Sequence, residues 1–104
     1  MDGFAIYPSL KGRTVFITGG ASGIGAEIVR AFAAQGAKVG FVDLDAAAAQ
    51  ALLDDLEGLH AFAEADLRDI AALRAGFATL KAALGPARVL VNNAARDDRH
   101  DWRD

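Results

Sequence analysis

Cysteine is absent from the 104-residue sequence. Disulfide bonds, thiolate nucleophiles and sulfur-ligated metal sites are therefore excluded, and the composition is compatible with a reducing cytoplasm. No apolar run approaches the roughly 18 residues of a membrane-spanning helix, and the N-terminus lacks a basic patch followed by an apolar segment. We expect a cytoplasmic protein that neither crosses a membrane nor is exported.

An excess of positive charge is also missing. The chain has 11 Lys and Arg against 14 Asp and Glu, a net charge of −3. Without a basic stripe it can neither neutralise the phosphates along a nucleic acid nor bind an anionic membrane surface, so we expect neither partner. The length suits one domain.

What the sequence does contain is an alternation of short apolar runs with amphipathic segments. We interpret the apolar runs at residues 14–18, 38–43, 60–65 and 89–91 as strands, the third of them near a sheet edge with His60 solvated. Helical patterns follow the first three runs, with Gly36 closing the first and Asp45 and Asp69 placed as N-caps of the next two. The predicted buried helix faces are Ile24, Ile28 and Phe32 in the first helix, and Ile70, Leu73, Phe77, Leu80 and Leu84 in the third.

Strands that alternate with helices predict an α/β fold, here a Rossmann-type doubly wound parallel sheet of about four strands in the order 3-2-1-4, with three helices. In that order the fourth strand, residues 89–91, is wholly apolar and yet ends the sheet. An unpaired hydrophobic edge promotes association. We therefore interpret residues 1–104 as the N-terminal part of a single domain whose remainder is absent from this chain.

A glycine-rich turn joins the first strand to the first helix. It reads Thr18-Gly19-Gly20-Ala21-Ser22-Gly23-Ile24-Gly25. Glycines at this place let backbone amides approach a diphosphate at the positive end of a helix, and a side chain at Gly19, Gly23 or Gly25 would block that approach or the helix packing. The alternative is a tight turn without a ligand.

Polar residues follow the other strands at the same predicted edge. Asp43 lies 18 residues after Gly25, close to the spacing of the acid that binds a ribose 2′-hydroxyl in dinucleotide sites. Its charge repels a 2′-phosphate, and neither Ser22 nor Leu44 offers a compensating cation, so NAD is favoured over NADP. Asp43 as a turn or cap residue is the alternative.

Asp66, after the third strand, can accept a hydrogen bond from an adenine amine or simply begin a turn. Asn92 and Asn93 follow the fourth strand, where their amides can bridge neighbouring loops, line the cofactor's ribose or form an ordinary turn.

Together these motifs resemble those of the short-chain dehydrogenase/reductase family along nearly the whole chain. Thr18-Gly19-(three residues)-Gly23-Ile24-Gly25 is similar to the family's cofactor turn, Asp66-Leu67 to its adenine-side acid, and Asn92-Asn93-Ala94-Ala95 to its fourth-strand motif. Ala95 departs from the glycine usual there. The resemblance implies an NAD(P)-binding domain whose cofactor residues here are Gly19, Ser22, Gly23, Ile24, Gly25, Asp43, Leu44, Asp66, Leu67, Asn93, Ala94 and Ala95.

The resemblance also implies hydride transfer between the nicotinamide and a small alcohol or carbonyl substrate, by a homo-oligomeric protein. The family's catalytic Ser, Tyr and Lys follow later in its chains, beyond Asp104, so we expect this chain alone to be inactive. Tyr7 and Lys11 have the family's Tyr-(three residues)-Lys spacing, but Pro8 and their place before the first strand argue against a catalytic role.

Two other functions remain open. The chain can be a non-catalytic dinucleotide-binding module or sensor, or part of an S-adenosylmethionine-dependent methyltransferase, whose sheet is similar but whose glycine turn is usually shorter. No metal site is expected, because nothing in the pattern converges His100 with the nearby aspartates Asp97, Asp98 and Asp101.

Overall fold

The structure is a computed structural model, and it describes residues 10–21 and 23–93. In these ranges four strands alternate with three helices: β1 (Thr14–Thr18), α1 (Gly23–Ala34), β2 (Lys38–Asp43), α2 (Ala46–Asp55), β3 (Ala61–Glu64), α3 (Ile70–Leu84) and β4 (Val89–Asn92). All the strands pair in parallel, in the order β3-β2-β1-β4. The predicted fold class and strand order are confirmed.

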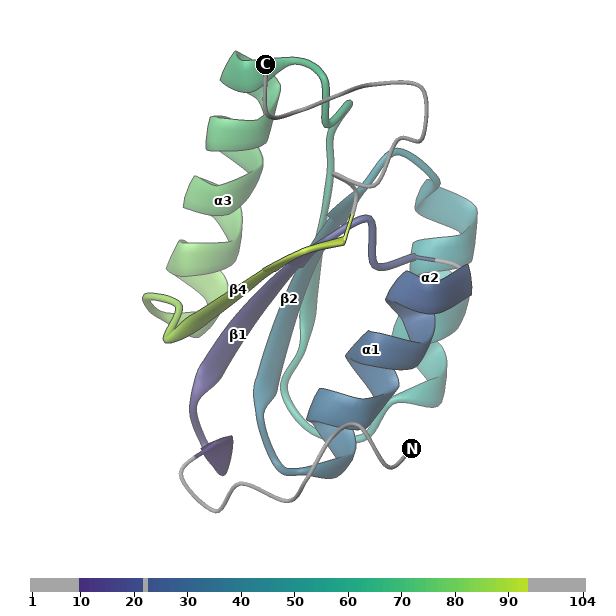
Figure 1. Cartoon of the computed structure of the whole chain (residues 1–104), viewed down its shortest axis with the longest axis vertical. Helices are drawn as coiled ribbons and strands as arrows, with labels where there is room; N and C mark the ends of the chain where they lie inside the picture. The colour runs from purple at the N-terminus through teal and green to yellow at the C-terminus, as the bar shows by residue number, and fades with distance from the viewer. Residues whose placement is uncertain (1–9, 22, 94–104) are drawn as a thin grey trace.

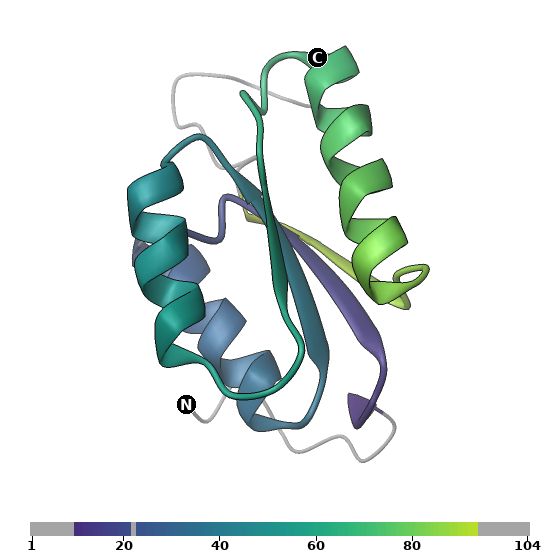
Figure 2. The same cartoon turned by 180° about the vertical axis from the view of Figure 1, so that it is seen from behind.

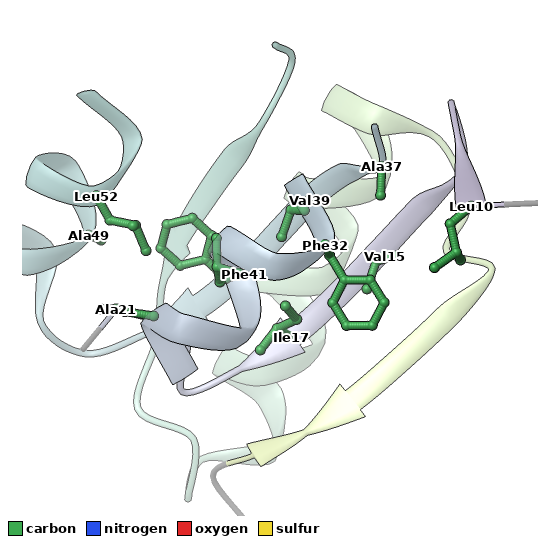
Figure 3. Close-up of a cluster of buried hydrophobic side chains, with 12 residues drawn as sticks. Leu10, Val15, Ile17, Ala21, Phe32, Ala37, Val39, Phe41, Ala49 and Leu52 are labelled. Atoms are coloured by element: carbon green, nitrogen blue, oxygen red, sulfur yellow. The ribbon is translucent and has the colours of Figure 1, made fainter. Parts of the chain in front are cut away.

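The sheet is covered on both faces, with α1 and α2 on one and α3 on the other (Figures 1 and 2). Side chains alternate along a strand, so each strand supplies both layers. Val15, Ile17, Val39 and Phe41 pack with Val29 and Phe32 of α1 and Leu52 of α2 (Figure 3). On the other face, Phe16 and Val42 pack with Leu80 and Leu84 of α3.

The helix ends agree with the sequence patterns. The Asp45 side chain accepts a hydrogen bond from the Ala48 N–H at 3.0 Å, and the Asp69 side chain accepts one from the Ala72 N–H at 3.1 Å. Beyond α1, Gly36 has a φ of +86°, which suits glycine and turns the chain into β2. Both predicted N-caps are confirmed.

The predicted buried face of α1 is only partly correct, because Phe32 is buried as expected but Ile24 is not. Ile24 is 62% exposed and Ile28 is only partly buried, whereas Gly25, Ala26, Val29 and Phe32 are buried. The helix packs through its smallest residues at its N-terminal end because there it lies against the backbone of the preceding turn. In α3, Ile70 at the first position is also exposed, contrary to expectation.

Strand boundaries shift slightly from those predicted. The third strand covers Ala61–Glu64 rather than residues 60–65, and β4 extends through Asn92, which pairs with Thr18.

His60, expected to be solvated, is instead hydrogen-bonded at the start of β3. Its Nδ1 accepts from the Val39 N–H at 3.0 Å, and Nε2, which then carries the proton, donates to the Glu57 carbonyl at 2.7 Å. The imidazole thus pairs a backbone amide of β2 just before the ladder with β3 begins at Gly40 and Ala61.

As predicted, β4 is an outer strand, and its Leu90 is 58% exposed. In the part of the chain that is described, no helix combines the length and apolarity needed to cross a membrane.

Candidate functional site

The candidate site lies where the parallel strands end. The register aligns Thr18 of β1 with Val42 of β2 and Asn92 of β4, and Asp43 with Glu64 of β3. The loops that leave these strands therefore start from one edge of the sheet (Figure 1). In open α/β sheets this edge, at the point where strand order reverses between β1 and β4, is where ligands bind.

The glycine turn after β1 is shaped by its backbone. Gly19 and Gly23 have φ values of +71° and +59°, a region that side chains disfavour, and Gly23 is the first residue of α1. A Cβ added at Gly25 would lie 1.8 Å from the Gly19 carbonyl oxygen. The turn thus brings its own backbone against the first turn of α1, whose leading N–H groups have no partner within the helix.

Two neighbouring strands hold this turn at Gly19. The Gly19 N–H donates to the Val42 carbonyl of β2 at 2.7 Å, and the side-chain amide of Asn93 donates to the Gly19 carbonyl at 3.0 Å. Beside them, the Thr18 hydroxyl donates to the side-chain oxygen of Asn92 at 2.8 Å. The two asparagines therefore bridge neighbouring strand ends, one of the interpretations left open by the sequence.

Asp43 reaches the same turn from the end of β2. One of its oxygens, Oδ2, accepts from the Ala21 N–H at 3.0 Å, and Oδ1 accepts from the Asp45 N–H at 3.1 Å. The side chain remains partly exposed. Next to it in the chain, Leu44 is 57% exposed, and Ile24 in the first turn of α1 is also exposed. A carboxylate beside an exposed apolar residue suits a ligand with both hydroxyls and flat rings.

Asp66, in the loop after β3, is engaged by Arg68. Its Oδ1 accepts from the backbone N–H and the Nε of Arg68 at 3.0 and 3.1 Å, and its Oδ2 accepts from a terminal guanidinium nitrogen at 3.1 Å. These side-chain and backbone hydrogen bonds hold the pKa of Asp66 below its ordinary value. One of the two alternatives predicted for Asp66, the start of a turn, is present. Its contact with adenine stays a prediction.

The remaining predicted cofactor residues fall into two groups. Leu67 is partly buried against the core on the α3 side. Ser22, Ala94 and Ala95 lie outside the described residues, as do Tyr7 and the segment around His100. Within residues 10–21 and 23–93, no group of three or more His, Asp or Glu side chains is arranged to hold a metal ion.

The sequence reasoning missed two partners in this region. Arg68 had a signal, because an aspartate commonly hydrogen-bonds the residue two positions later in a turn. The bond from the Ala21 amide had no signal in the sequence, because every residue except proline has a backbone N–H.

A surface cavity of about 520 Å³ lies between α1 and the segment that ends α2. Its walls include Arg30, Ala33, Asp55 and Glu57, and none of the predicted cofactor residues. Both α1 and α2 begin at the carboxyl ends of the strands, where the candidate site lies. The cavity is at the C-terminal ends of these helices and therefore lies at the opposite end of the strands.

Comparison with known proteins gives a consistent result. A family model described as short chain dehydrogenase matches residues 13–104. Over 98 residues the chain is 51% identical to a probable galactose dehydrogenase of Rhizobium meliloti, covering 89% of this chain and 38% of that protein. It is 47% identical over 103 residues to a D-xylose 1-dehydrogenase of Caulobacter vibrioides, covering 96% of this chain and 40% of the relative.

Solved structures show the same relationship. A hydroxysteroid dehydrogenase from Escherichia coli superposes with a TM-score of 0.75 at 34% identity, over 80% of this chain and 37% of that one. A short-chain dehydrogenase/reductase from Serratia marcescens gives a TM-score of 0.77 at 35% identity, over 84% of this chain and 37% of the other. The chain thus spans about two-fifths of the length of the proteins it matches.

Proposed function

This chain belongs to the short-chain dehydrogenase/reductase family, and on that premise we propose that it provides the cofactor-binding part of an NAD-dependent oxidoreductase. The observation that carries the proposal is the convergence at the glycine turn. The Asp43 carboxylate at the end of β2 accepts from the Ala21 N–H of the turn, and the side-chain amide of Asn93, just after β4, donates to the Gly19 carbonyl at the start of the turn. Three strand ends are thereby organised around one turn at the start of a helix, the arrangement that suits a diphosphate.

The proposed contacts follow the order of the strands. The turn holds the diphosphate through backbone amides, with Gly19, Ser22, Gly23, Ile24 and Gly25 as its residues. Asp43 and Leu44 bind the adenosine ribose, and Asp66 and Leu67 the adenine. Asn93, Ala94 and Ala95 border the ribose on the nicotinamide side.

The donors and acceptors present fit such a cofactor. A carboxylate offers about four acceptor positions, and the amides of Ala21 and Asp45 use one on each oxygen of Asp43. Counting only the residues that the structure describes, each oxygen therefore keeps one acceptor position, and the two oxygens can accept from a neighbouring pair of ribose hydroxyls. NAD, when bound, supplies the nicotinamide carbon that exchanges the hydride. This chain's residues bind and orient it.

The preference for NAD over NADP rests on the charge of Asp43. Its carboxylate repels a 2′-phosphate, and Arg68, the cation in the loop after β3, is paired with Asp66. A dianionic phosphate beside Asp43 would thus meet a negative charge, and the guanidinium that the structure describes after β3 is already paired.

Catalysis and substrate belong to the complete protein. We propose that the acid/base residues follow Asp104, that this chain by itself transfers no hydride, and that the substrate is a small alcohol or carbonyl compound. The two relatives named above are described as a probable galactose dehydrogenase and a D-xylose 1-dehydrogenase. The matched region is the cofactor-binding part, so the identities do not choose among these substrates.

Reading the gene beyond the codon for Asp104 tests this part of the proposal. Roughly the next 60 codons should encode a serine and a Tyr-(three residues)-Lys pair on a helical pattern. A genuine stop codon after Asp104 would contradict it and would favour the dinucleotide-binding module, which should then be monomeric and bind NAD tightly by itself.

The cofactor assignment is tested by titration calorimetry with NAD, NADP and S-adenosylmethionine. We expect the complete protein to bind NAD at least about tenfold more tightly than NADP, a difference of about 1.4 kcal/mol. Asp43→Ala should narrow that ratio by removing the repulsion, whereas Asp54→Ala, which removes an exposed carboxylate of α2, should not. An unchanged ratio in Asp43→Ala refutes the role of Asp43, and binding of S-adenosylmethionine alone would favour a methyltransferase.

A further inference from the structure

The Asp43 carboxylate links the starts of two helices. Ala21 lies in the glycine turn that leads into α1, and Asp45 is the N-cap of α2. Oδ2 accepts from the first and Oδ1 from the second, at 3.0 and 3.1 Å. Each oxygen of Asp43 therefore accepts one backbone hydrogen bond.

Ala21 depends on this carboxylate more than the rest of the turn does. The backbone bond to Val42 and the side-chain bond from Asn93 both hold Gly19, two residues earlier. Ala21 is 4% exposed and packs in the core under α1. A backbone N–H at such a position is costly to leave without an acceptor.

We propose that Asp43 is a positioning residue for the glycine turn: it holds the Ala21 amide, and with it the diphosphate-binding backbone, in place before the cofactor arrives. This role is additional to sugar recognition and rests on the proposed function for its purpose. The same two bonds also fix the carboxylate, because each of its oxygens accepts from a backbone amide. Sugar and diphosphate recognition are then coupled through one side chain, which reduces the ordering required on binding.

The exchange rates of backbone amides test the proposal directly. In nuclear magnetic resonance spectra of the complete protein, Asp43→Ala should speed exchange of the Ala21 and Asp45 amides by about tenfold or more, since hydrogen bonds to charged acceptors are the stronger ones. Asp43→Asn has nearly the same shape but one acceptor oxygen and an NH₂ group, so it should release one of the two amides. Asp66→Ala is the matched control, because that carboxylate bonds Arg68 and not the turn. Unchanged exchange of Ala21 in Asp43→Ala overturns the proposal.

A measurement on the unsubstituted protein keeps the test valid if a variant fails to fold. A scalar coupling across the hydrogen bond should connect the Ala21 amide nitrogen to the Asp43 carboxyl carbon, and its absence would overturn the proposal.

Binding of inorganic pyrophosphate separates positioning from sugar recognition, because this probe has no ribose. Loss of the Asp43 charge alone would strengthen the binding of an anion, whereas loss of the turn's support weakens it. We expect Asp43→Ala to bind pyrophosphate at least about threefold more weakly, and a gain in affinity would overturn the proposal. If the unsubstituted protein binds neither pyrophosphate nor NAD, the proposed cofactor function fails while amide exchange still decides the positioning role.

Discussion

Replacing Gly25 with alanine should disrupt the turn through a single methyl group. The added Cβ would lie 1.8 Å from the Gly19 carbonyl oxygen and 3.0 Å from the Asn93 side-chain nitrogen that donates to this oxygen. Both atoms belong to the turn and its support, and the carbonyl is backbone. Either α1 moves away from the turn or Gly19 moves and loses the bond from Asn93.

The size of the effect follows from three contributions. Overpacking costs about 1–3 kcal/mol, the lost hydrogen bond about 0.5–1.5 kcal/mol, and alanine recovers about 0.5–1 kcal/mol through its higher helix propensity. The free energy of unfolding should therefore fall by about 2 kcal/mol, which lowers the Tm of a domain of this size by about 8–16 °C. The affinity for NAD should fall at least about tenfold, since the displaced atoms are those proposed to face the diphosphate.

Gly76→Ala is the matched control, because Gly76 is also a buried helical glycine. A Cβ there would meet Ala63 and Val42 side-chain carbons at 3.5 and 3.6 Å, which is ordinary van der Waals contact. Its Tm should rise by about 2–8 °C through helix propensity, with NAD binding unaffected. Differential scanning calorimetry and NAD titration compare the two variants. Equal stability and equal affinity in both would refute the close approach at Gly25.

Three further predictions concern other parts of the chain. Arg68→Ala should raise the pKa of Asp66 part of the way back toward 3.8, because the side-chain hydrogen bonds that lower it most are lost while the backbone N–H of residue 68 still donates. The ion pair stabilises the fold above the unfolded-state pKa and is lost as pH falls through the lower folded-state pKa. An unshifted carboxyl titration by nuclear magnetic resonance would contradict this. His60→Ala removes the acceptor of the buried Val39 N–H and should lower the free energy of unfolding, measured with urea, by about 1–3 kcal/mol. His60→Asn should lose less stability than His60→Ala, because its carboxamide oxygen can replace Nδ1 as the acceptor. Equal losses of stability in the two variants would argue against that bond. Leu90→Lys places a charge on the exposed apolar edge strand and should reduce self-association of the 104-residue chain in light scattering, whereas undiminished association would locate the contact elsewhere.

The fold could be predicted because its signals are local. The apolar runs at β1 and β2, with glycines or polar residues at their ends, define those strands to the residue. Asp45 and Asp69 bond amides three residues ahead, so their capping role is visible within one turn of sequence. The strand order then follows from the general geometry of doubly wound sheets. The boundaries of β3 and β4 were harder to place. Apolar and polar residues alternate only weakly in β3, and β4 ends in a polar residue, so the pattern does not show whether the terminal residues belong to the strand.

Residue types and spacing were also enough to identify the candidate site. Gly19, Gly23 and Gly25 precede or begin the first helix, and Asp43 ends the neighbouring strand. No spacing, however, indicates that the Asp43 carboxylate bonds the Ala21 amide 22 residues earlier, or that Asn93 bonds a carbonyl 74 residues away. Such partners are chosen by how the loops fold toward each other.

The sequence alone determined the alternation of strands and helices, the helix N-caps, and the glycines and acids at the strand ends. Each of these features depends on neighbours within a few residues. Only the tertiary structure decided which face of α1 is buried, what His60 and Asp66 bond, and how the glycine turn is held. These outcomes depend on the distance between packed backbones. The apolar side chain of Ile24 stays exposed where Gly25 lets α1 approach the turn.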